Sequence, residues 1–495
     1  MRLENREWVL VLLLFLTGCL VRLIPELTAY PYPIGYDVIN YYIPVVTDFA
    51  SHWTAISSEL PLYVSFLHAL QVATGLNPYS IVVILATITF GGFSISIFLI
   101  ARRLFKVDIG YSVFVTVFVI FQLAVLRTTW DLHRDVLALT ITFFLIVLIH
   151  KDSERKKTMG LDWKVILLAT ILCVLVVSTD RMIGLLFIMT LIIYSSIART
   201  RTVILFTVVA LTSFTFEFLS ANIAGNLIRE SVGQPANISP GTFSSYNPTN
   251  LIVLFAVLDG ILVPTALIGL KLLKNAILLK IPLLVTGFAS FSWIVFPFRE
   301  SLVADRWIIL FGVFLSLFAA YGIFRLIQIL KIRKLPYLRS RYPISTKLFF
   351  ILPSCILGTF ILMGVLYEIL PFSPESSLLW HGIARNYIES FVPSSMQYNS
   401  LPINDNHKMI DAISWINKNT QSNAIIIGEK HWRGFMELYL QGHRTYLFSD
   451  SLESMANGLI RQVPKIHVYM IHYSGFKDNN TIVYSNILFS IEKVE

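Results

Sequence analysis

Residues 8–21 of the chain read WVLVLLLFLTGCLV, and residues 32–42 read YPIGYDVINYY. The first run has no charged side chain. Extended to residues 7–24, it approaches the ~20 mostly apolar residues that a membrane-spanning helix needs. The second run is rich in aromatic residues and carries the acid Asp37. We therefore expect a membrane helix that is followed, just beyond its end, by a loop containing Asp37.

The rest of the chain repeats this apolar character. Its 495 residues are 55% hydrophobic and 14% charged, and the mean hydropathy is +0.69. Soluble domains carry about 25% charged residues, so the composition predicts a polytopic α-helical membrane protein. About eleven apolar segments are candidate spans: 7–24, 81–100, 111–127, 136–150, 165–179, 183–197, 203–219, 251–270, 281–297, 307–330 and 348–370.

Basic residues alternate between the connecting segments in a way that predicts the orientation. If the N-terminus lies inside, the inner segments hold 22 Lys and Arg residues, and the outer segments before the last span hold six. The positive-inside rule then predicts an inner N-terminus and an outer C-terminus. The net charge of +9 follows from this topology and gives no reason to expect nucleic-acid binding.

Cysteine usage bears on the location of the protein. The three cysteines, Cys19, Cys173 and Cys355, all fall inside predicted spans, so the outer part needs no disulfide. Disulfides are common in oxidising compartments and in secreted domains. Their absence favours a prokaryotic plasma membrane, archaeal or bacterial.

The chain divides into three predicted parts. Residues 1–370 form the membrane domain, residues 371–403 a surface helix (376–392) and a linker, and residues 404–495 a small extracytoplasmic α/β domain. Strands alternate with helices in this last part, which predicts a small, mostly parallel sheet. Its expected strands are 424–428, 444–448, 466–472, 482–488 and 489–494, and its helices are 405–417, 432–441 and 452–461. Within the membrane domain, residues 222–250 are expected to be an irregular loop.

Acids and arginines recur in the segments that the topology places outside. Such charges are costly near a membrane and indicate function. Each short outer segment offers at least one acid and one Arg, and bundling of the helices would bring them into one polar cavity. The residues are Asp37, Asp131, His133, Arg134, Asp135, Asp180, Arg181, Arg299, Glu300, Asp305 and Arg306.

These side chains predict a particular kind of substrate. A carboxylate can deprotonate a hydroxyl group or bind a divalent metal ion such as Mg or Mn through oxygen. Arginine binds phosphate bidentately, and an apolar groove between helices suits a lipid tail. The combination predicts a donor linked to a lipid phosphate, attacked by an acceptor from the outer side.

The topology and the Gly-Tyr-Asp core of residues 34–42 resemble the GT-C superfamily, and residues 130–137 do so more weakly. This superfamily contains polytopic glycosyltransferases that use polyprenyl-phosphate sugars, among them protein O-mannosyltransferases, the lipid A aminoarabinose transferase and oligosaccharyltransferase catalytic subunits. The resemblance implies a transferase of the cell envelope whose partners are a polyprenyl-phosphate sugar, membrane lipids and a lipid, glycan or protein acceptor.

By this resemblance Asp37 is the catalytic carboxylate, and Asp131 and Asp135 are acids near the donor phosphate or a metal. Four arginines would bind the donor phosphate: Arg134, Arg181, Arg299 and Arg306. The substrate groove would contain Tyr36, Tyr41, Tyr42 and His133.

Two features depart from the family pattern. Val38 follows Asp37, whereas many mannosyltransferases have adjacent Asp and Glu at this place. The Trp-Trp-Asp-Tyr-Gly motif of oligosaccharyltransferases is absent, and residues 431–434 read His-Trp-Arg-Gly instead. An oligosaccharyltransferase is therefore not expected.

Other interpretations stay open at this level. Asp37 could cap the short helix that follows it, and Asp131 and Asp135 could be an acidic first turn. Arg134 and Arg181 could be interfacial anchors, and the tyrosines an ordinary aromatic belt. For the whole protein, the alternative function is a transporter or flippase of lipid-linked glycans, although no internal repeat supports it.

Overall fold

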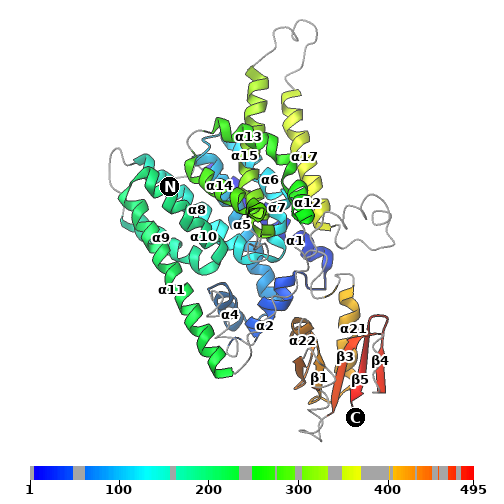
Figure 1. The fold of residues 1–495 in the computed structure, drawn as a ribbon. Helices are drawn as coiled ribbons and strands as arrows, with labels where there is room; N and C mark the ends of the chain where they lie inside the picture. The colour runs from blue at the N-terminus through cyan, green and yellow to red at the C-terminus, as the bar shows by residue number, and fades with distance from the viewer. Residues whose placement is uncertain are drawn as a thin grey trace.

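The structure, a computed structural model, describes residues 5–47, 49, 62–155, 163–232, 248–273, 276–295, 304–332, 348–369, 401, 405–429, 432–448, 455, 467–474 and 481–494. A helical bundle carries a small sheet domain at one end (Figure 1). The bundle consists of α1 (Asn5–Ala29), α5 (Pro78–Arg103), α6 (Ile109–Ile120), α7 (Leu123–Asp131), α8 (His133–Arg155), α9 (Trp163–Thr179), α10 (Arg181–Ala198), α11 (Arg201–Val232), α12 (Pro248–Leu258), η2 (Gly260–Leu262), α13 (Val263–Leu272), α14 (Ile277–Phe291), η3 (Ser292–Ile294), α15 (Ala304–Ile332) and α17 (Leu348–Ile369).

The helices of the bundle match the eleven apolar segments of the sequence. Among the described residues, seven helices are long and apolar enough to cross a membrane, and nine spans result if each of two bent pairs counts as one. The bent pairs are α6 with α7, at 59°, and α12 with η2 and α13, at 48°. The two remaining segments are the shorter apolar helices Trp163–Thr179 and Pro353–Ile369. The protein is thus a multi-pass membrane protein.

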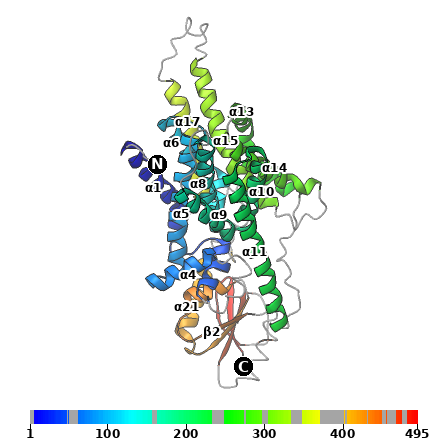
Figure 2. The same cartoon turned by 90° about the vertical axis from the view of Figure 1, so that its left-hand side faces the viewer.

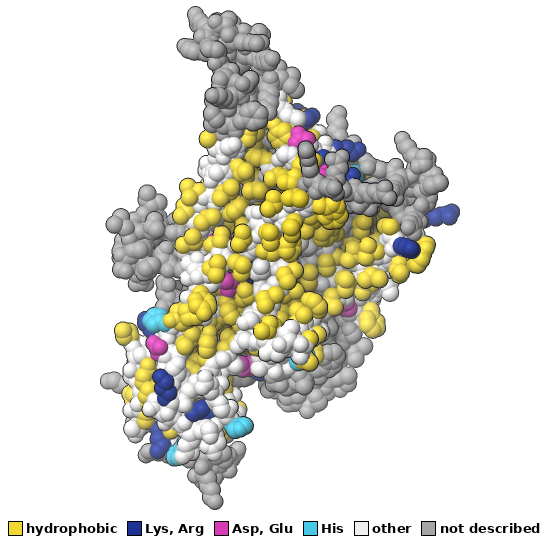
Figure 3. All heavy atoms as spheres, turned by 180° about the vertical axis from the view of Figure 1, so that it is seen from behind, with side chains coloured by type: hydrophobic (Ala, Val, Ile, Leu, Met, Phe, Trp, Pro, Cys, Tyr) yellow, Lys and Arg dark blue, Asp and Glu magenta, His cyan; other side chains and the backbone are white. Residues whose placement is uncertain are grey.

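Both the surface and the interior of the bundle are apolar. Figure 3 shows a broad hydrophobic band over the helices, with charged side chains mostly above and below it. Large apolar side chains are exposed on the helices, among them Leu12 of α1 and Leu284 and Phe288 of α14. A soluble protein rarely exposes so large a continuous apolar area, whereas a lipid-facing surface requires one.

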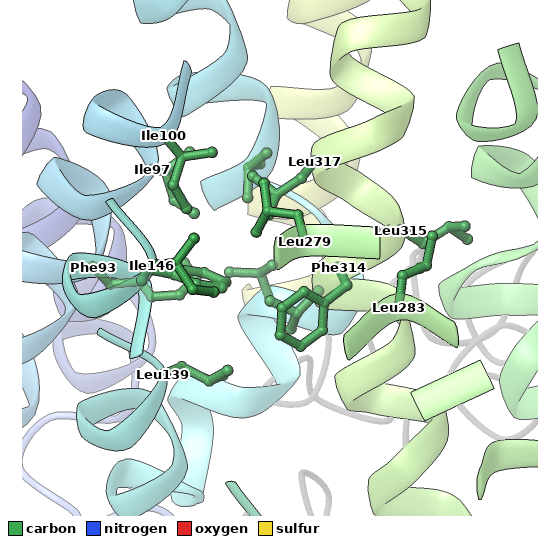
Figure 4. Packing of buried hydrophobic residues seen from close by; sticks show 14 of the residues in the cluster. Phe93, Ile97, Ile100, Leu139, Ile146, Leu279, Leu283, Phe314, Leu315 and Leu317 are labelled. Carbon is green, nitrogen blue, oxygen red and sulfur yellow. The ribbon is translucent and has the colours of Figure 1, made fainter. Parts of the chain in front are cut away.

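Apolar side chains from four helices interlock in the centre of the bundle. Phe93 of α5, Leu139 of α8, Leu283 of α14 and Phe314 of α15 belong to one buried cluster, which Figure 4 shows from close by. The Phe143 ring packs edge-on against Phe314, with 5.5 Å between centroids. These large, fully buried side chains fix the distance between α8 and α15, the two helices whose first turns carry candidate site residues.

The segment after α1 forms three short helices at one end of the bundle, which we call the Asp37 end. They are η1 (Val38–Tyr42), a π-helical turn, α2 (Ile43–Thr47) and α4 (Leu62–Thr74). Figures 1 and 2 show α2 and α4 between the bundle and the sheet domain, and α11 projecting beyond the bundle at this end.

The C-terminal domain has a five-stranded sheet with the order β2-β1-β3-β5-β4. Strands β1, β2 and β3 pair in parallel, but β5 pairs antiparallel with β3 and β4, so the expectation of a mostly parallel sheet is wrong. The hairpin between β4 and β5 is too short for a crossover, which forces antiparallel pairing. The elements are α21 (Asn406–Asn419), β1 (Ile425–Gly428), α22 (Arg433–Tyr439), β2 (Thr445–Phe448), β3 (Val468–Tyr473), β4 (Thr481–Ser485) and β5 (Phe489–Val494).

This domain packs directly on the first segment of the Asp37 end. One continuous buried cluster includes Ile39 and Tyr42 of η1 and Trp432 and Phe435 of the domain, all fully buried. Gly434 touches η1 so closely that a Cβ atom there would overlap the carbonyl oxygen of Ile39. The Asn406 side chain donates a hydrogen bond to the Pro33 carbonyl at 3.3 Å. The domain therefore holds the segment that carries Asp37.

Two further expectations about boundaries need correction. Residues 222–232 belong to α11, so the expectation of an irregular loop beginning at residue 222 is wrong. Helix α1 continues through Pro25 to Ala29, which places Arg22 and Glu26 inside it. The surface helix at 376–392, most of the linker and most of the helix at 452–461 lie outside the described residues.

Candidate functional site

Asp37 lies where the chain turns from α1 into η1. The turn passes through Gly35, which has φ +96°, a value that favours glycine. A Cβ there would also lie 3.2 Å from the carbonyl oxygen of Trp130 in α7. Asp37 directly precedes η1 and is half-buried, yet its side chain makes no capping hydrogen bond. Capping therefore does not account for this carboxylate.

Two arginines from different helices lie within electrostatic range of Asp37. Arg134 lies in the first turn of α8 and Arg306 in the first turn of α15, and each interacts electrostatically with the Asp37 carboxylate. Both guanidinium groups are mostly buried, and they repel one another. Two cations held together in this way, with a carboxylate beside them, attract an anion with more than one negative oxygen.

Two buried carboxyl groups interact with the arginines. Asp135 of α8 is 2% exposed, and Asp180 is 5% exposed and caps α10 by accepting hydrogen bonds from the backbone N–H groups of Met182 and Ile183, both at 2.9 Å. The two carboxyl groups are within hydrogen-bonding reach of each other, and both attract Arg306. They supply the opposite charge that the mostly buried arginines need, since a buried charge needs a partner.

The predicted groove residues surround this cluster at different depths. Arg134 lies over the ring of Tyr41, 5.1 Å from its centroid. Tyr42 is fully buried and stacks on the ring of His133 at 5.7 Å and 17°. Tyr36 is 40% exposed; its partial burial and the nearby Asp37 raise the pKa of its phenol. Tyr36 and Tyr41 are thus at least partly accessible, whereas Tyr42 and His133 are buried.

The remaining predicted residues stand apart from this arrangement. Arg181 is exposed and interacts with Glu217 of α11, which also receives a hydrogen bond from Ser178. Arg299 lies outside the described residues. Asp131 ends α7, and its side chain is likewise outside the described part of the chain.

A second charged cluster, which the sequence analysis did not identify, lies deeper in the bundle. Arg22 is 1% exposed, pairs with Glu26 at 2.7 Å, and contacts the Nε2 atom of His133 at 3.1 Å. The hydroxyl of Tyr79 donates to Glu26. Glu368 of α17 is fully buried and also interacts with Arg22. The signal was present in the sequence, because Arg22 and Glu26 are an i, i+4 pair within an apolar run.

The arrangement of the described carboxylates bears on whether a divalent metal ion could bind. The residues that the structure describes contain no group of three or more His, Cys, Asp or Glu side chains placed to hold one. Asp135 and Asp180 approach each other, but Arg134 and Arg306 lie beside them and would repel a cation. The described carboxylates therefore do not form a site for Mg or Mn.

Comparison with known proteins gives matches among solved structures. No protein-family model matches the chain. No curated protein sequence matches it either. ArnT from Cupriavidus metallidurans, in the apo state, aligns with 99% of this chain over 98% of its own length, with a TM-score of 0.55 and 11% identity. The same protein bound to undecaprenyl phosphate gives a TM-score of 0.55 at 10% identity, with the same coverage of both chains.

An oligosaccharyltransferase from Archaeoglobus fulgidus is similar over 94% of this chain and 69% of its own, with a TM-score of 0.51 and 12% identity. The archaeal oligosaccharyltransferase AglB of the same organism was solved in complex with an inhibitory peptide and a dolichol-phosphate. It gives a TM-score of 0.50 at 12% identity, over 94% of this chain and 70% of its own. At these identities the likeness establishes the fold. The chain therefore shares its fold with ArnT and with these oligosaccharyltransferases. Oligosaccharyltransferase catalytic subunits are among the proteins that the sequence resembles, so the fold expected from that resemblance is confirmed.

Proposed function

We propose that the protein is an integral-membrane glycosyltransferase that moves a sugar from a polyprenyl-phosphate donor to a lipid, glycan or protein acceptor on the outer face of a prokaryotic plasma membrane. The observation that carries this proposal is the electrostatic proximity of Asp37 to Arg134 and Arg306 at one end of a bundle with this fold. Similar folds have been solved with undecaprenyl phosphate and with a dolichol-phosphate, which supports a lipid phosphate as the anion.

In this proposal the two arginines bind the phosphate of the donor. Their guanidinium groups neutralise the charge that develops on the phosphate oxygen as the bond from that oxygen to the sugar breaks. Polyprenyl phosphate then leaves with the bonding electrons. Asp135 and Asp180 fix the arginines without touching the donor.

Asp37 acts on the acceptor. Its carboxylate accepts the proton of the acceptor hydroxyl while the hydroxyl oxygen forms the new bond to the anomeric carbon. Asp37 suits this role because it is half-buried and its carboxylate lies within electrostatic range of the two arginines that would bind the donor phosphate. The C-terminal domain, packed on η1, would shape the acceptor side of the site.

One observation favours the alternative function, transport of a lipid-linked glycan. Two of the spans are broken, at 59° and 48°, and discontinuous helices are typical of transporters. Broken spans alone do not supply a path across the membrane. The charged residues of the candidate site, moreover, gather at one end of the bundle.

The deciding experiment uses membranes that contain the full chain and polyprenyl phosphate carrying a labelled sugar. A glycosyltransferase releases unlabelled polyprenyl phosphate and moves the label to another molecule. A transporter leaves the labelled donor intact and changes only the leaflet in which it resides. Intact donor after prolonged incubation with a range of acceptors would refute the proposal.

A further inference from the structure

Arg22 contacts His133, which directly precedes Arg134 of the candidate site. Arg22 lies in α1, and its side chain is 1% exposed. A charge inside a membrane bundle is costly, so its contacts indicate what it is for. The Nη2 atom reaches two groups, Glu26 Oε1 at 2.7 Å and His133 Nε2 at 3.1 Å. Glu26 neutralises the charge, and His133 belongs to another helix.

The contact with Arg22 fixes the state of the His133 ring. Arginine is only a donor, so Nε2 of His133 accepts the hydrogen bond and the ring proton resides on Nδ1. The ring is 2% exposed and stacks nearly flat on Tyr42, at 5.7 Å and 17°. A held imidazole ring thus defines the position of Tyr42 in η1.

The His133 ring is connected both to η1, which follows Asp37, and to Arg134 of α8. Tyr42 ends the helical turn that Asp37 begins, and Tyr42 also interacts with Arg134. On the other side, His133 directly precedes Arg134 in α8. A shift of the His133 ring would therefore move the base and the phosphate ligand relative to each other.

We propose that Arg22 is a positioning residue, which holds the His133 ring and through it sets the distance between Asp37 and Arg134. This inference rests on the function proposed above. Misplacement of catalytic groups by about 1 Å can cost about 100-fold in rate, so loss of the contact is expected to lower kcat by about 10- to 100-fold.

The test removes the charge pair as a unit. Arg22→Met alone would leave Glu26 as a buried unpaired charge, which is strongly destabilising, so Glu26→Gln is introduced with it. The matched control is Arg102→Met with Glu7→Gln. Arg102 of α5 pairs with Glu7 of α1 at 2.7 Å, near the opposite end of α1 from Arg22 and Glu26. Sugar transfer per folded molecule is measured, with thermal unfolding as the check on folding.

The expected result is a loss of about 10- to 100-fold for the Arg22/Glu26 pair and near-normal turnover for the Arg102/Glu7 control. A double-mutant cycle adds His133→Phe, which keeps a ring against Tyr42 but removes the acceptor nitrogen. If Arg22 acts through His133, the Arg22/Glu26 change costs no further activity in that background. Arg22→Lys, which keeps a charge and a donor, should retain more activity than the neutral pair.

Three outcomes would overturn the inference. Equal losses in the Arg22/Glu26 and control variants would mean that Arg22 only stabilises the bundle. Additive losses with His133→Phe would mean that it does not act through the ring. Absence of sugar transfer by the unmodified protein would overturn the proposed function itself, and the inference with it; the other two outcomes leave that function standing.

Discussion

Gly434→Ala tests whether the C-terminal domain holds the segment that carries Asp37. The added Cβ would overlap the carbonyl oxygen of Ile39, which is backbone and cannot rotate away. Overpacking of a well-packed contact typically costs about 1–3 kcal/mol. Because 1.4 kcal/mol is a factor of ten, the ratio of docked to undocked domain should fall by about 5- to 150-fold.

The direction in which Gly434→Ala changes stability distinguishes a clash at the docked domain from an effect of alanine within α22. Alanine is a better helix former than glycine by about 1 kcal/mol, so within an undocked α22 the change would be neutral or stabilising. Hydrogen–deuterium exchange measures this directly. In the variant, the amide of Ile39, which donates to the Gly35 carbonyl at 3.1 Å, should exchange faster, and sugar transfer should fall.

Gly358→Ala is the matched control, since nothing lies within 4 Å of the Cβ that it adds in α17. It should leave exchange in η1 and sugar transfer unchanged. Unchanged or slower exchange at Ile39 in Gly434→Ala would refute the claim that the domain positions this segment.

Further predictions concern charge, pH and topology. Arg306→Gln should raise the KM for the donor by about 10- to 100-fold, because a hydrogen bond to a charged group contributes about 1.5–3 kcal/mol; the exposed Arg181 should tolerate the same change with little effect on donor kinetics. Burial raises the pKa of Glu429, so its ionised form disfavours folding, and Glu429→Gln should raise the unfolding temperature at neutral pH but not at a pH below the ordinary carboxyl range. A cysteine label near position 160 should report the cytoplasmic side and one at position 495 the outer side; the reverse result would place the site on the wrong face.

The spans were predictable because each depends on local composition. Each apolar segment of the sequence coincides with a helix or a bent pair of helices. The bends themselves were not foreseen. Asp259 occupies the break between α12 and η2, where its carboxyl group packs against Gly312 of α15, and such a contact between distant segments leaves no periodic trace in the sequence.

The sheet illustrates a second limit. The strand positions were predicted closely, since β1 and β5 are short buried runs with clear boundaries. Strand direction depends on which strands pair, and β5 enters the sheet between β3 and β4. That choice is made by long-range packing, which strand propensity does not encode.

The candidate site was predicted in part for a physical reason. Topology alone places the first turns of α8 and α15 at the same end of the bundle as Asp37, so the proximity of Arg134 and Arg306 could be expected. The Arg22–Glu26 pair is hard to identify from sequence, because its residues fall within or beside an apolar run that predicts a membrane span. Burying an i, i+4 ion pair inside such a run is energetically costly, and polar partners on other helices offset this cost. His133 and Tyr79 are such partners here.

The role of Asp37 is tested most directly by Asp37→Asn, assayed as sugar transfer from a polyprenyl-phosphate donor. Asparagine keeps the size of the side chain but cannot accept the proton, so transfer should fall by about 100- to 10,000-fold with unchanged folding. Asp108→Asn is the control: Asp108 caps α6 by accepting from the Tyr111 backbone N–H at 3.0 Å, and asparagine is nearly as good a cap. Near-normal transfer by a folded Asp37→Asn protein would contradict the assignment of Asp37 as the base.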